Sequence, residues 1–327
     1  MQVDYRIVAD GIDITERFQK RLVSLVINDE AGSKSDTAEI KVDDRDHAID
    51  LPPTGATLQI AIGFVGDLVE IGSYVVDELA GDISPATMTI RAKSADMLSG
   101  IRARKTRAWP DSSIERIAGT IAGEHGLKPV ISDSLKSKLF GYLAQTSESD
   151  LNFLTRIARD LDAVAKPAGG ALLFVKRGKG KSADGSSLPV YRVNRTDISR
   201  GSWQINGRGR YGSVVAEWGE RGTATVHKVQ IGRDDPKLIL RHRHPNEAEA
   251  RRAAEAALDR SHRASGTIDI QLGGFWGDLL AEGKVDLRGI KPELEGEWLI
   301  TRVQHRLSRT LTTSFEAERD NEKAQSE

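Results

Sequence analysis

The chain has 327 residues, of which 39% are hydrophobic and 29% are charged, a balance typical of folded globular proteins that excludes a wholly disordered, collagen-like or coiled-coil chain. Its 47 Lys and Arg residues against 48 Asp and Glu residues leave a net charge of −1, so the overall charge does not draw it to nucleic acid or to an anionic membrane. Cysteine is absent, which excludes disulfides, thiol nucleophiles and metal sites built on cysteine.

The first hundred residues begin without an apolar secretory signal, and no apolar run in the chain reaches the ~20 residues that span a bilayer. We therefore expect a soluble protein with no membrane insertion.

Residues 37–42, 57–64 and 87–92 alternate apolar and polar side chains with the period of two that is typical of half-buried strands. Pro52-Pro53-Thr54-Gly55 and Gly81-Asp82 are predicted to be turns. This succession of strands predicts a small barrel or sandwich over residues 1–100.

The pattern becomes helical after residue 110. Ser112-Ser113-Ile114-Glu115 has the spacing of a capping box with Ser112 as the cap, and it predicts a helix that ends at Gly126. A second helix is predicted after Ser147-Glu148-Ser149-Asp150. The two apolar faces comprise Ile114, Ile117, Ala118, Ile121 and Ala122 in the first helix and Leu151, Leu154, Ile157, Ala158 and Leu161 in the second. With a buried strand at 171–175 and a hairpin loop at 176–187, residues 101–205 are assigned to a small α+β insert domain with two helices.

Strands return in the last third of the chain. Short strands are predicted at 213–218, 223–231 and 237–242, a helix from Asn246 to about Arg263, and further strands at 267–272, 297–307 and 312–317. We assign 206–320 to a second β domain with one embedded helix and 321–327 to a polar tail. The predicted fold class is α+β, mainly β, with two barrel or sandwich domains flanking a small α+β domain.

Three motifs suggest a ligand site, but each lacks the structural context that its chemistry needs. Gly207 to Gly212 matches G-x-G-x-x-G, yet a strand-like segment follows where a dinucleotide site needs a helix N-terminus. Gly180-Lys181-Ser182 lacks the first glycine of a phosphate loop, because position 175 is Val. His242 and His244 have H-x-H spacing, but a metal site would need further ligands from carboxylates, His227 or His262. We assign no catalytic, cofactor-binding or metal-binding residue.

Two alternatives to a structural role remain open. Residues 102–109, Arg-Ala-Arg-Lys-Thr-Arg-Ala-Trp, are basic with an adjacent aromatic residue, a pattern that suits single-stranded nucleic acid but also an interdomain linker or subunit contact. The near-neutral chain favours the linker or subunit contact. The second alternative is a peptidoglycan hydrolase that uses Glu148 and Asp150, although helix capping and a favourable charge at the helix N-terminus are the simpler roles for both residues.

The order of several short motifs resembles the phage late control D proteins, the baseplate hub proteins of contractile tails. Each motif is modestly specific, but the series covers the first half of the chain well, and beyond about residue 200 the resemblance rests on the order of elements. The matching segments are Tyr5-Arg6, Ala9 to Thr15, Leu51 to Ala56, Val76-Asp77-Glu78, Ile90 to Asp96, Arg107 to Trp109, and Gln145 to Asp150 followed by Leu154-Thr155-Arg156.

The resemblance implies a structural protein without cofactors, located in a phage or tailocin baseplate and assembled in the bacterial cytoplasm. Its two β domains would be tube-like, and a homotrimer would form a ring around a central channel that adapts a threefold spike to a sixfold tail tube. The implied partners are the central spike, the tail tube or tube-initiator protein, the tape-measure protein and the baseplate wedge proteins. DNA would be only a passing cargo, and the alternative hydrolase would be associated with the tail. The chain ends soon after Ala317 without an oligonucleotide-binding fold or β-helix, so the needle is expected to be a separate chain.

Overall fold

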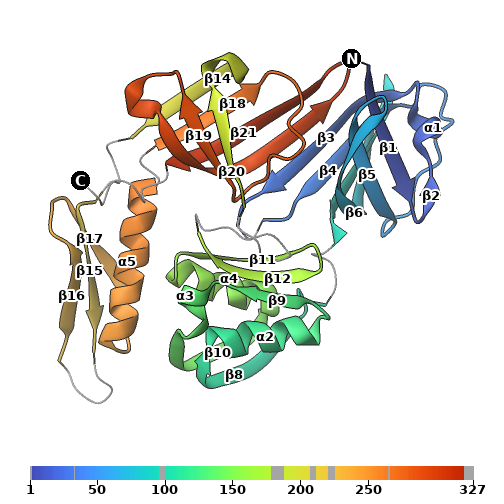
Figure 1. Cartoon of the computed structure of the whole chain (residues 1–327). Helices are drawn as coiled ribbons and strands as arrows, with labels where there is room; N and C mark the ends of the chain where they lie inside the picture. The colour runs from blue at the N-terminus through green and yellow to red at the C-terminus, as the bar shows by residue number, and fades with distance from the viewer. Residues whose placement is uncertain are drawn as a thin grey trace.

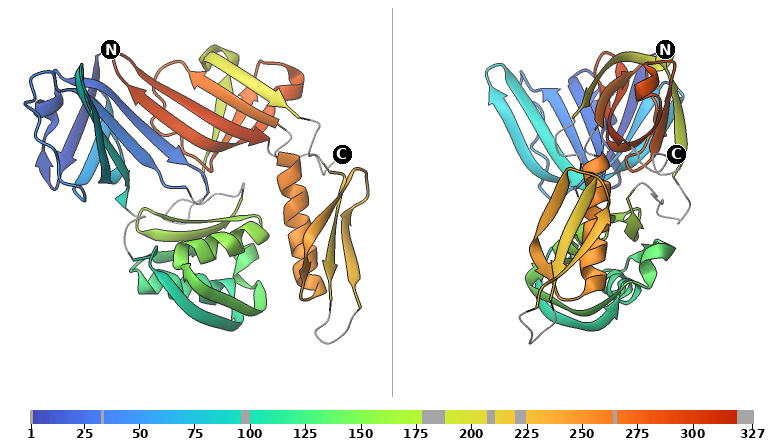
Figure 2. Two further views of the ribbon diagram at one scale, coloured as in Figure 1. Left: turned by 180° about the vertical axis from the view of Figure 1, so that it is seen from behind. Right: turned by 90° about the vertical axis from the view of Figure 1, so that its left-hand side faces the viewer.

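The computed structural model describes residues 2–32, 34–95, 100–177, 188–206, 211–219, 225–263 and 266–319. It is mainly β, which confirms the predicted fold class. Two β units lie side by side in an elongated body, an insert of helices and strands lies below them, and one long helix with a three-stranded sheet forms a separate layer (Figures 1 and 2). No helix within these ranges is long and apolar enough to cross a membrane.

The first β unit contains the three strands that the alternation predicted, at β4, β5 and β7, with their apolar side chains in one core. Its elements are β1 (Val3–Ala9), β2 (Ile12–Asp13), α1 (Thr15–Phe18), β3 (Leu22–Glu30), β4 (Thr37–Asp43), β5 (Thr57–Phe64), β6 (Asp67–Ile83) and β7 (Ala86–Ser94). The turn predicted at Gly81-Asp82 is wrong, because both residues lie within β6 and pair with β7. Glycine serves a close strand approach here: a Cβ at position 81 would lie 2.3 Å from the Thr87 carbonyl oxygen.

The second β unit has its own buried core around Trp298 and Phe315. Its elements are β13 (Val190–Asn194), the 3-10 helix η2 (Arg195–Asp197), β14 (Ile198–Ile205), β18 (Gly266–Leu272), β19 (Lys284–Arg288), the 3-10 helix η3 (Pro292–Leu294), β20 (Gly296–Leu307) and β21 (Leu311–Arg319). Trp298 is 1% exposed, and its indole N–H donates to the Leu294 carbonyl at 2.9 Å, so its one polar atom is satisfied inside the core.

One continuous sheet joins the two units, in the order β14-β18-β21-β20-β3-β4-β7-β6-β5-β1-β2, with β19 and β13 branching from β20. The junction is the antiparallel pairing of β3 with β20, in which Leu25 lies opposite Leu307 and Ile27 opposite His305. Directly paired residues share one side of a sheet, and Leu307 and Val303, on the same side of β20, belong to the cores of the first and second units. Both cores therefore lie on one side of the sheet, and its other side is polar.

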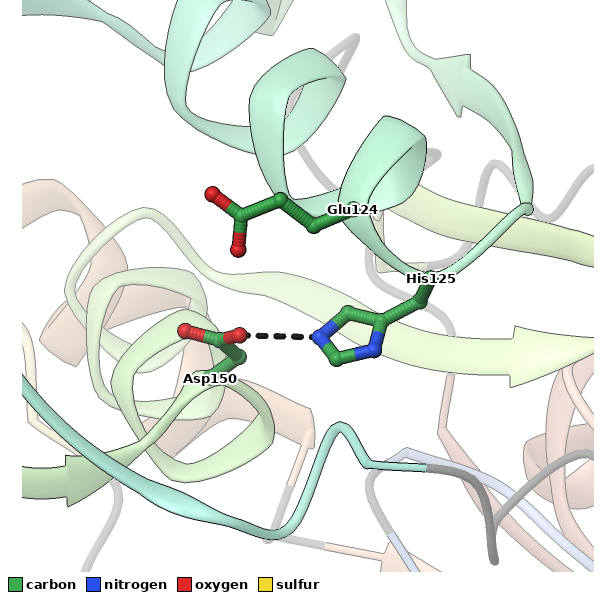
Figure 3. Close-up of side chains that lie close together, drawn as sticks. All are labelled: Glu124, His125 and Asp150. Carbon is green, nitrogen blue, oxygen red and sulfur yellow. Dashed lines mark hydrogen bonds and ion pairs between the residues drawn. The ribbon is translucent and has the colours of Figure 1, made fainter.

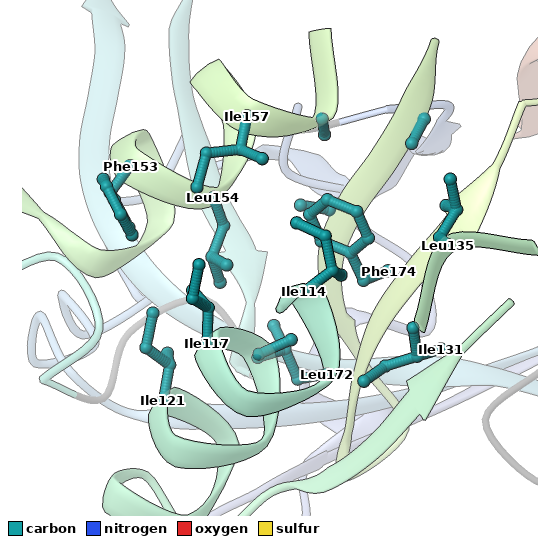
Figure 4. Packing of buried hydrophobic residues seen from close by; sticks show 14 of the residues in the cluster. Ile114, Ile117, Ile121, Ile131, Leu135, Phe153, Leu154, Ile157, Leu172 and Phe174 are labelled. Atoms are coloured by element: carbon teal, nitrogen blue, oxygen red, sulfur yellow. The ribbon is translucent and has the colours of Figure 1, made fainter. Parts of the chain in front are cut away.

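The insert packs two helices against two small sheets, one of two strands and one of three, below the junction. Its elements are β8 (Arg104–Ser113), α2 (Ile114–Glu124), β9 (Lys128–Ile131), α3 (Asp133–Lys136), β10 (Leu139–Ser149), α4 (Asp150–Asp160), β11 (Ala163–Ala168) and β12 (Ala171–Lys176). The apolar faces predicted for both helices are buried in one core with the strand at 171–176, and Figure 4 shows Ile114, Ile117, Ile121, Leu154, Ile157, Leu172 and Phe174 gathered there.

Two local predictions in the insert are wrong. The cap of α2 is Ser113, whose hydroxyl accepts a hydrogen bond from the Arg116 amide at 3.2 Å, whereas the Ser112 hydroxyl donates to the Pro110 carbonyl. The basic stretch at 102–109 is not a linker, because β8 begins at Arg104 and pairs with β10. Both corrections have one cause: the strand extends up to the helix, so it includes the residues whose local pattern suggested a loop and a cap.

Strand pairing also departs from the predicted domain boundaries. β13 and β14, assigned from the sequence to the insert, are hydrogen-bonded to β19 and β18 of the second β unit. The helix α5 (Glu247–Arg263) is not embedded in that unit: it packs on β15 (Ser213–Trp218), β16 (His227–Gly232) and β17 (Lys237–His244) around a separate core. These pairings join segments that are tens of residues apart, and local periodicity carries no information on them. The predicted tail at 321–327 and most of the predicted loop at 176–187 lie outside the described residues.

Candidate functional site

A group of charged side chains surrounds the buried Asp150 in the insert (Figure 3). Asp150 is the first residue of α4, and its side chain is fully buried. Its Oδ2 atom accepts a hydrogen bond from Lys105 Nζ at 2.6 Å and lies 2.9 Å from His125 Nε2. Its Oδ1 atom accepts from Arg107 at 2.6 Å and from the Gln145 amide at 2.8 Å. The period of two in β8 places both cations on one side of the strand, facing the start of α4.

Glu124 completes the charge balance of this group. It accepts hydrogen bonds from Lys105 at 2.7 Å and from Arg107 at 2.6 Å, so two carboxylates face two cations. Burial raises the pKa of Asp150, but hydrogen bonds from Lys105, Gln145 and His125 outweigh it and bring the pKa to about 2. Burial also raises the pKa of Glu124, and hydrogen bonds from the same two cations lower it below its ordinary value. Both carboxylates are therefore ionised at neutral pH.

Glu124, His125 and Asp150 offer ligand atoms within 4.8 Å of one another, a spacing that would suit a metal ion. However, Lys105 and Arg107 already neutralise both carboxylates at hydrogen-bond distance. A metal ion would have to displace two cations from a partly buried site, and nothing in the donor set offsets that cost. We interpret the group as an ion-pair network that fastens β8, α2 and α4 together.

The same geometry opposes the hydrolase hypothesis for Glu148 and Asp150. Glycoside hydrolysis needs a carboxyl group that holds its proton and a second carboxylate across an open cleft. Asp150 is buried and ionised, and both Glu148 carboxylate oxygens bond to Arg156, at 3.2 and 2.9 Å. The capping interpretation is incomplete as well: Asp150 lies in the first turn of α4 as expected, but the cap is Ser149, which accepts from the Asn152 amide.

The nucleic-acid hypothesis for residues 102–109 also loses the side chains that it requires. Lys105 and Arg107 are held by Glu124 and Asp150. Trp109 is 7% exposed and stacks on Phe153 with ring centres 6.0 Å apart, so it offers no free face for a base. The alternation of Lys105, Arg107 and Trp109 was the signal in the sequence that would have indicated one face of a strand.

The remaining sequence motifs give little support for a ligand site. Residues 207–210 of the glycine motif and Gly180-Lys181-Ser182 lie outside the described residues, but β15 begins at Ser213, so a strand follows the glycine motif as predicted. His242 and His244 lie on β17, and burial lowers the pKa of His244 despite the nearby Asp160 carboxylate. Within the described ranges, neither histidine belongs to a group of three possible metal ligands.

The polar side of the sheet, over the eight strands from β14 to β6, is a second candidate surface. Arg91 pairs there with Glu39 at 3.1 Å and with Glu78 at 2.7 Å, so charges of opposite sign neutralise each other across strands. Arg302 does the same with Glu30 and Glu316, at 3.4 and 3.3 Å. One row of directly paired residues crosses the sheet through Arg200, Gln271, Ser314, Gln304, Asn28, Thr37 and Lys93.

A buried lysine fastens the insert to this sheet. Lys166 of β11 donates to the Asp36 carboxylate at 2.7 Å and to the Glu30 carbonyl at 2.8 Å, at neighbouring ends of β4 and β3. Burial lowers the pKa of Lys166, but the Asp29 and Asp36 carboxylates outweigh burial and raise it, so the lysine stays charged. An ion pair with little access to water therefore helps to hold the insert against the sheet.

Comparison with known proteins gives a consistent result. Residues 47–311 match the family described as phage tail baseplate hub (GPD). The chain is 30% identical to the probable baseplate hub proteins of Escherichia phages 186 and P2 over 358 aligned positions, which cover 96% of this chain and 92% of each relative. Its fold is similar to that of the 43 kDa tail protein of prophage MuSo2 from Shewanella oneidensis, with a TM-score of 0.72 and 14% identity over 96% of this chain and 98% of the other.

Proposed function

Because the chain belongs to the phage tail baseplate hub family, we propose that three copies of it form a ring with a central channel, which adapts a threefold spike to the sixfold tail tube. The observation that carries this proposal is the continuous sheet with all of its cores on one side. A sheet with one apolar-backed side and one polar side suits a wall between packed protein and an aqueous passage. The polar side faces the channel in this arrangement.

The dimensions of the sheet suit such a channel. Three sheets of eight strands, at about 4.8 Å per strand, close into a cylinder with a circumference of roughly 115 Å and a backbone diameter of about 37 Å, before strand tilt widens it. Packed sheets lie ~10 Å apart, so each side-chain layer takes about 5 Å and a passage of roughly 27 Å is left. Cross-strand ion pairs such as Arg91 with Glu39 leave few unpaired cations to hold a passing polyanion.

The two β units account for the change of symmetry. The first unit contributes seven strands and the second contributes six, and both place their core on the same side of the shared sheet. A ring of three chains then presents six comparable modules around the channel. A threefold spike can bind the repeat of whole chains, while a sixfold tube can bind the repeat of modules.

The proposal includes the partners and the absence of catalysis. The hub would bind the spike on one side and the tube or tube-initiator protein on the other, with the tape-measure protein in the channel and the wedge proteins around the ring. Assembly would take place in the host cytoplasm. No enzymatic role is proposed, because the carboxylates of the insert are paired with Lys105, Arg107 and Arg156.

Light scattering on the purified protein, alone and with its spike, tests the ring. We expect a mass near three times 35.7 kDa in at least one of the two samples. A chain that stays monomeric with every tail partner would overturn the ring. An assay on purified cell wall tests the absence of catalysis: release of wall fragments that is lost in Asp150→Asn or Glu148→Gln would support the hydrolase instead.

A further inference from the structure

We propose how neighbouring copies join: the edge of β14 in one copy pairs with the outer half of β6 in the next copy, and the neighbour's Ile83 fills an apolar groove beside Trp203. This inference rests on the proposed ring and names its joint. It follows from the two ends of the eight-stranded sheet, where each terminal strand has one side without a partner in the described residues.

Both strand edges lack a hydrogen-bonded partner in the described residues over several consecutive positions. β14 pairs with β18 on one side only, from Ile198 to Ile205. β6 pairs with β7 along its whole second half, but its pairing with β5 ends at Val75, so residues 77–83 have one free side. Unpaired strand edges of this kind bind another strand readily, and soluble proteins cover or pair them.

The side chains at the two edges match in character. Trp203 lies opposite Ile268, on the core side of the sheet, yet it is 53% exposed. It borders a groove of about 480 Å³ that is floored by core residues and rimmed by cations, and the residues that the argument uses are Trp203, Ile268, Leu287, Arg195, Arg200 and Lys291. At the opposite edge, Ile83 is 91% exposed, which is unusual for an isoleucine in a strand. It pairs with Ala86, next to Asp82 on the polar side, so Ile83 lies on the core side as well.

Strand direction agrees with this joint. All eight strands from β14 to β6 are antiparallel to their neighbours, so the first and the last run in opposite directions. When the last strand meets the first strand of the next copy, the antiparallel pattern continues without interruption. A head-to-tail contact of this kind can close into a ring of three.

The second copy of this chain is therefore the occupant of the groove. An acidic segment of another tail protein is the competing occupant, and it would leave Ile83 exposed in the ring. The choice between them rests on continuity: a second copy brings a free strand edge and an exposed apolar side chain together at the end of the same sheet.

Cysteine cross-linking tests the joint directly, because the natural chain has no cysteine. Each of four double variants carries one cysteine on the polar side of β6, at Ala80→Cys or Asp82→Cys. The other cysteine lies on the polar side of β14, at Ser202→Cys or Gln204→Cys. Opposed residues of paired strands bring their Cβ atoms about 5 Å apart, close enough for a disulfide after a small shift. We expect mild oxidation of the ring to give a covalent trimer with at least one pair. A control pairs Asp82→Cys with Val190→Cys, on the exposed edge of β13, and should give none.

Ile83→Asp tests the groove. The side chain is exposed in the single chain, so the variant should fold normally. The dissociation constant of the ring should rise at least tenfold. Ile12→Asp, at a similarly exposed isoleucine of the first unit, is the matched control and should leave the ring unchanged.

The outcomes separate this joint from the ring itself. A wild-type trimer that none of the four cysteine pairs cross-links, and that Ile83→Asp leaves intact, would overturn the joint and leave the ring standing. A wild-type chain that never forms a trimer would overturn both. Loss of the ring in both Ile83→Asp and Ile12→Asp would show a general effect of added charge and would also count against the groove.

Discussion

Replacing Asp150 with Asn is expected to destabilise the insert by about 2.5 kcal/mol at neutral pH. The variant keeps the size of the side chain but removes the charge that Lys105, Arg107 and His125 contact. The pKa of this carboxyl is about 2 in the fold and ~3.9 in an unfolded chain, and each pKa unit corresponds to about 1.36 kcal/mol. The Lys105 and Arg107 side chains are 32% and 23% exposed, so water stabilises them in part, and the cost stays below the ~3–5 kcal/mol of a fully buried broken pair.

The pH dependence of this difference follows from the direction of the pKa shift. Because the pKa of folded Asp150 lies below that of the unfolded chain, its contribution is complete above about pH 4 and is lost as the pH falls towards 2. We expect a constant gap between wild type and Asp150→Asn from pH 5 to 8, and a narrowing gap below pH 4. Urea titration of the full chain, followed by amide hydrogen exchange in α2 and α4, measures the insert separately from the β units.

Glu148→Gln is the matched control for Asp150→Asn, since it also removes one carboxylate near the start of α4. Its partner Arg156 is 44% exposed, so we expect a cost below about 1 kcal/mol. A cost below about 0.5 kcal/mol for Asp150→Asn, or a gap that does not change between pH 5 and pH 2, would refute the interpretation of this group as a stabilising ion-pair network.

Three further predictions concern stability. Leu25→Ala, at the junction of the two β units, should cost about 2–5 kcal/mol in urea unfolding because a fully buried side chain is lost, whereas Ile12→Ala should cost less than about 0.5 kcal/mol. Burial lowers the pKa of His305 to about 4, so the free energy of unfolding of the wild type should fall by up to about 3 kcal/mol between pH 6.5 and pH 4. In His305→Gln, urea unfolding should show a smaller decrease over the same pH range. Ser113→Ala should lower the free energy of opening of α2 by about 1 kcal/mol, as measured by amide hydrogen exchange, because Ser113 caps that helix. An unchanged exchange rate would contradict the cap.

Much of the fold was predictable from local patterns. The period of two identified β4, β5 and β7, and helical spacing identified the buried faces of α2 and α4, because each element must turn its apolar side to a core that its own residues create. The prediction failed where a strand was longer than its clearest pattern, as at Gly81-Asp82 within β6 and at Ser112 at the end of β8.

The candidate sites were less accessible to sequence reasoning. Asp150 lies in the first turn of a helix, where a carboxylate has a sufficient local reason to occur, so nothing in the sequence indicated its bonds to Lys105 and Arg107, more than 40 residues away. Likewise, Trp203 and Ile83 are ordinary strand residues until the sheet order shows that both lie at its free ends.

The sequence by itself determined the mainly β class, the two helices of the insert and, through the order of its motifs, the resemblance to the hub family. Only the tertiary structure decided that β3 pairs with β20, that β14 belongs to the second β unit, and that both cores lie on one side of a single sheet. The physical reason is the range of the interactions. Periodicity and capping act over a few residues, whereas the pairing of Leu25 with Leu307 depends on which strand edges meet after the chain has folded.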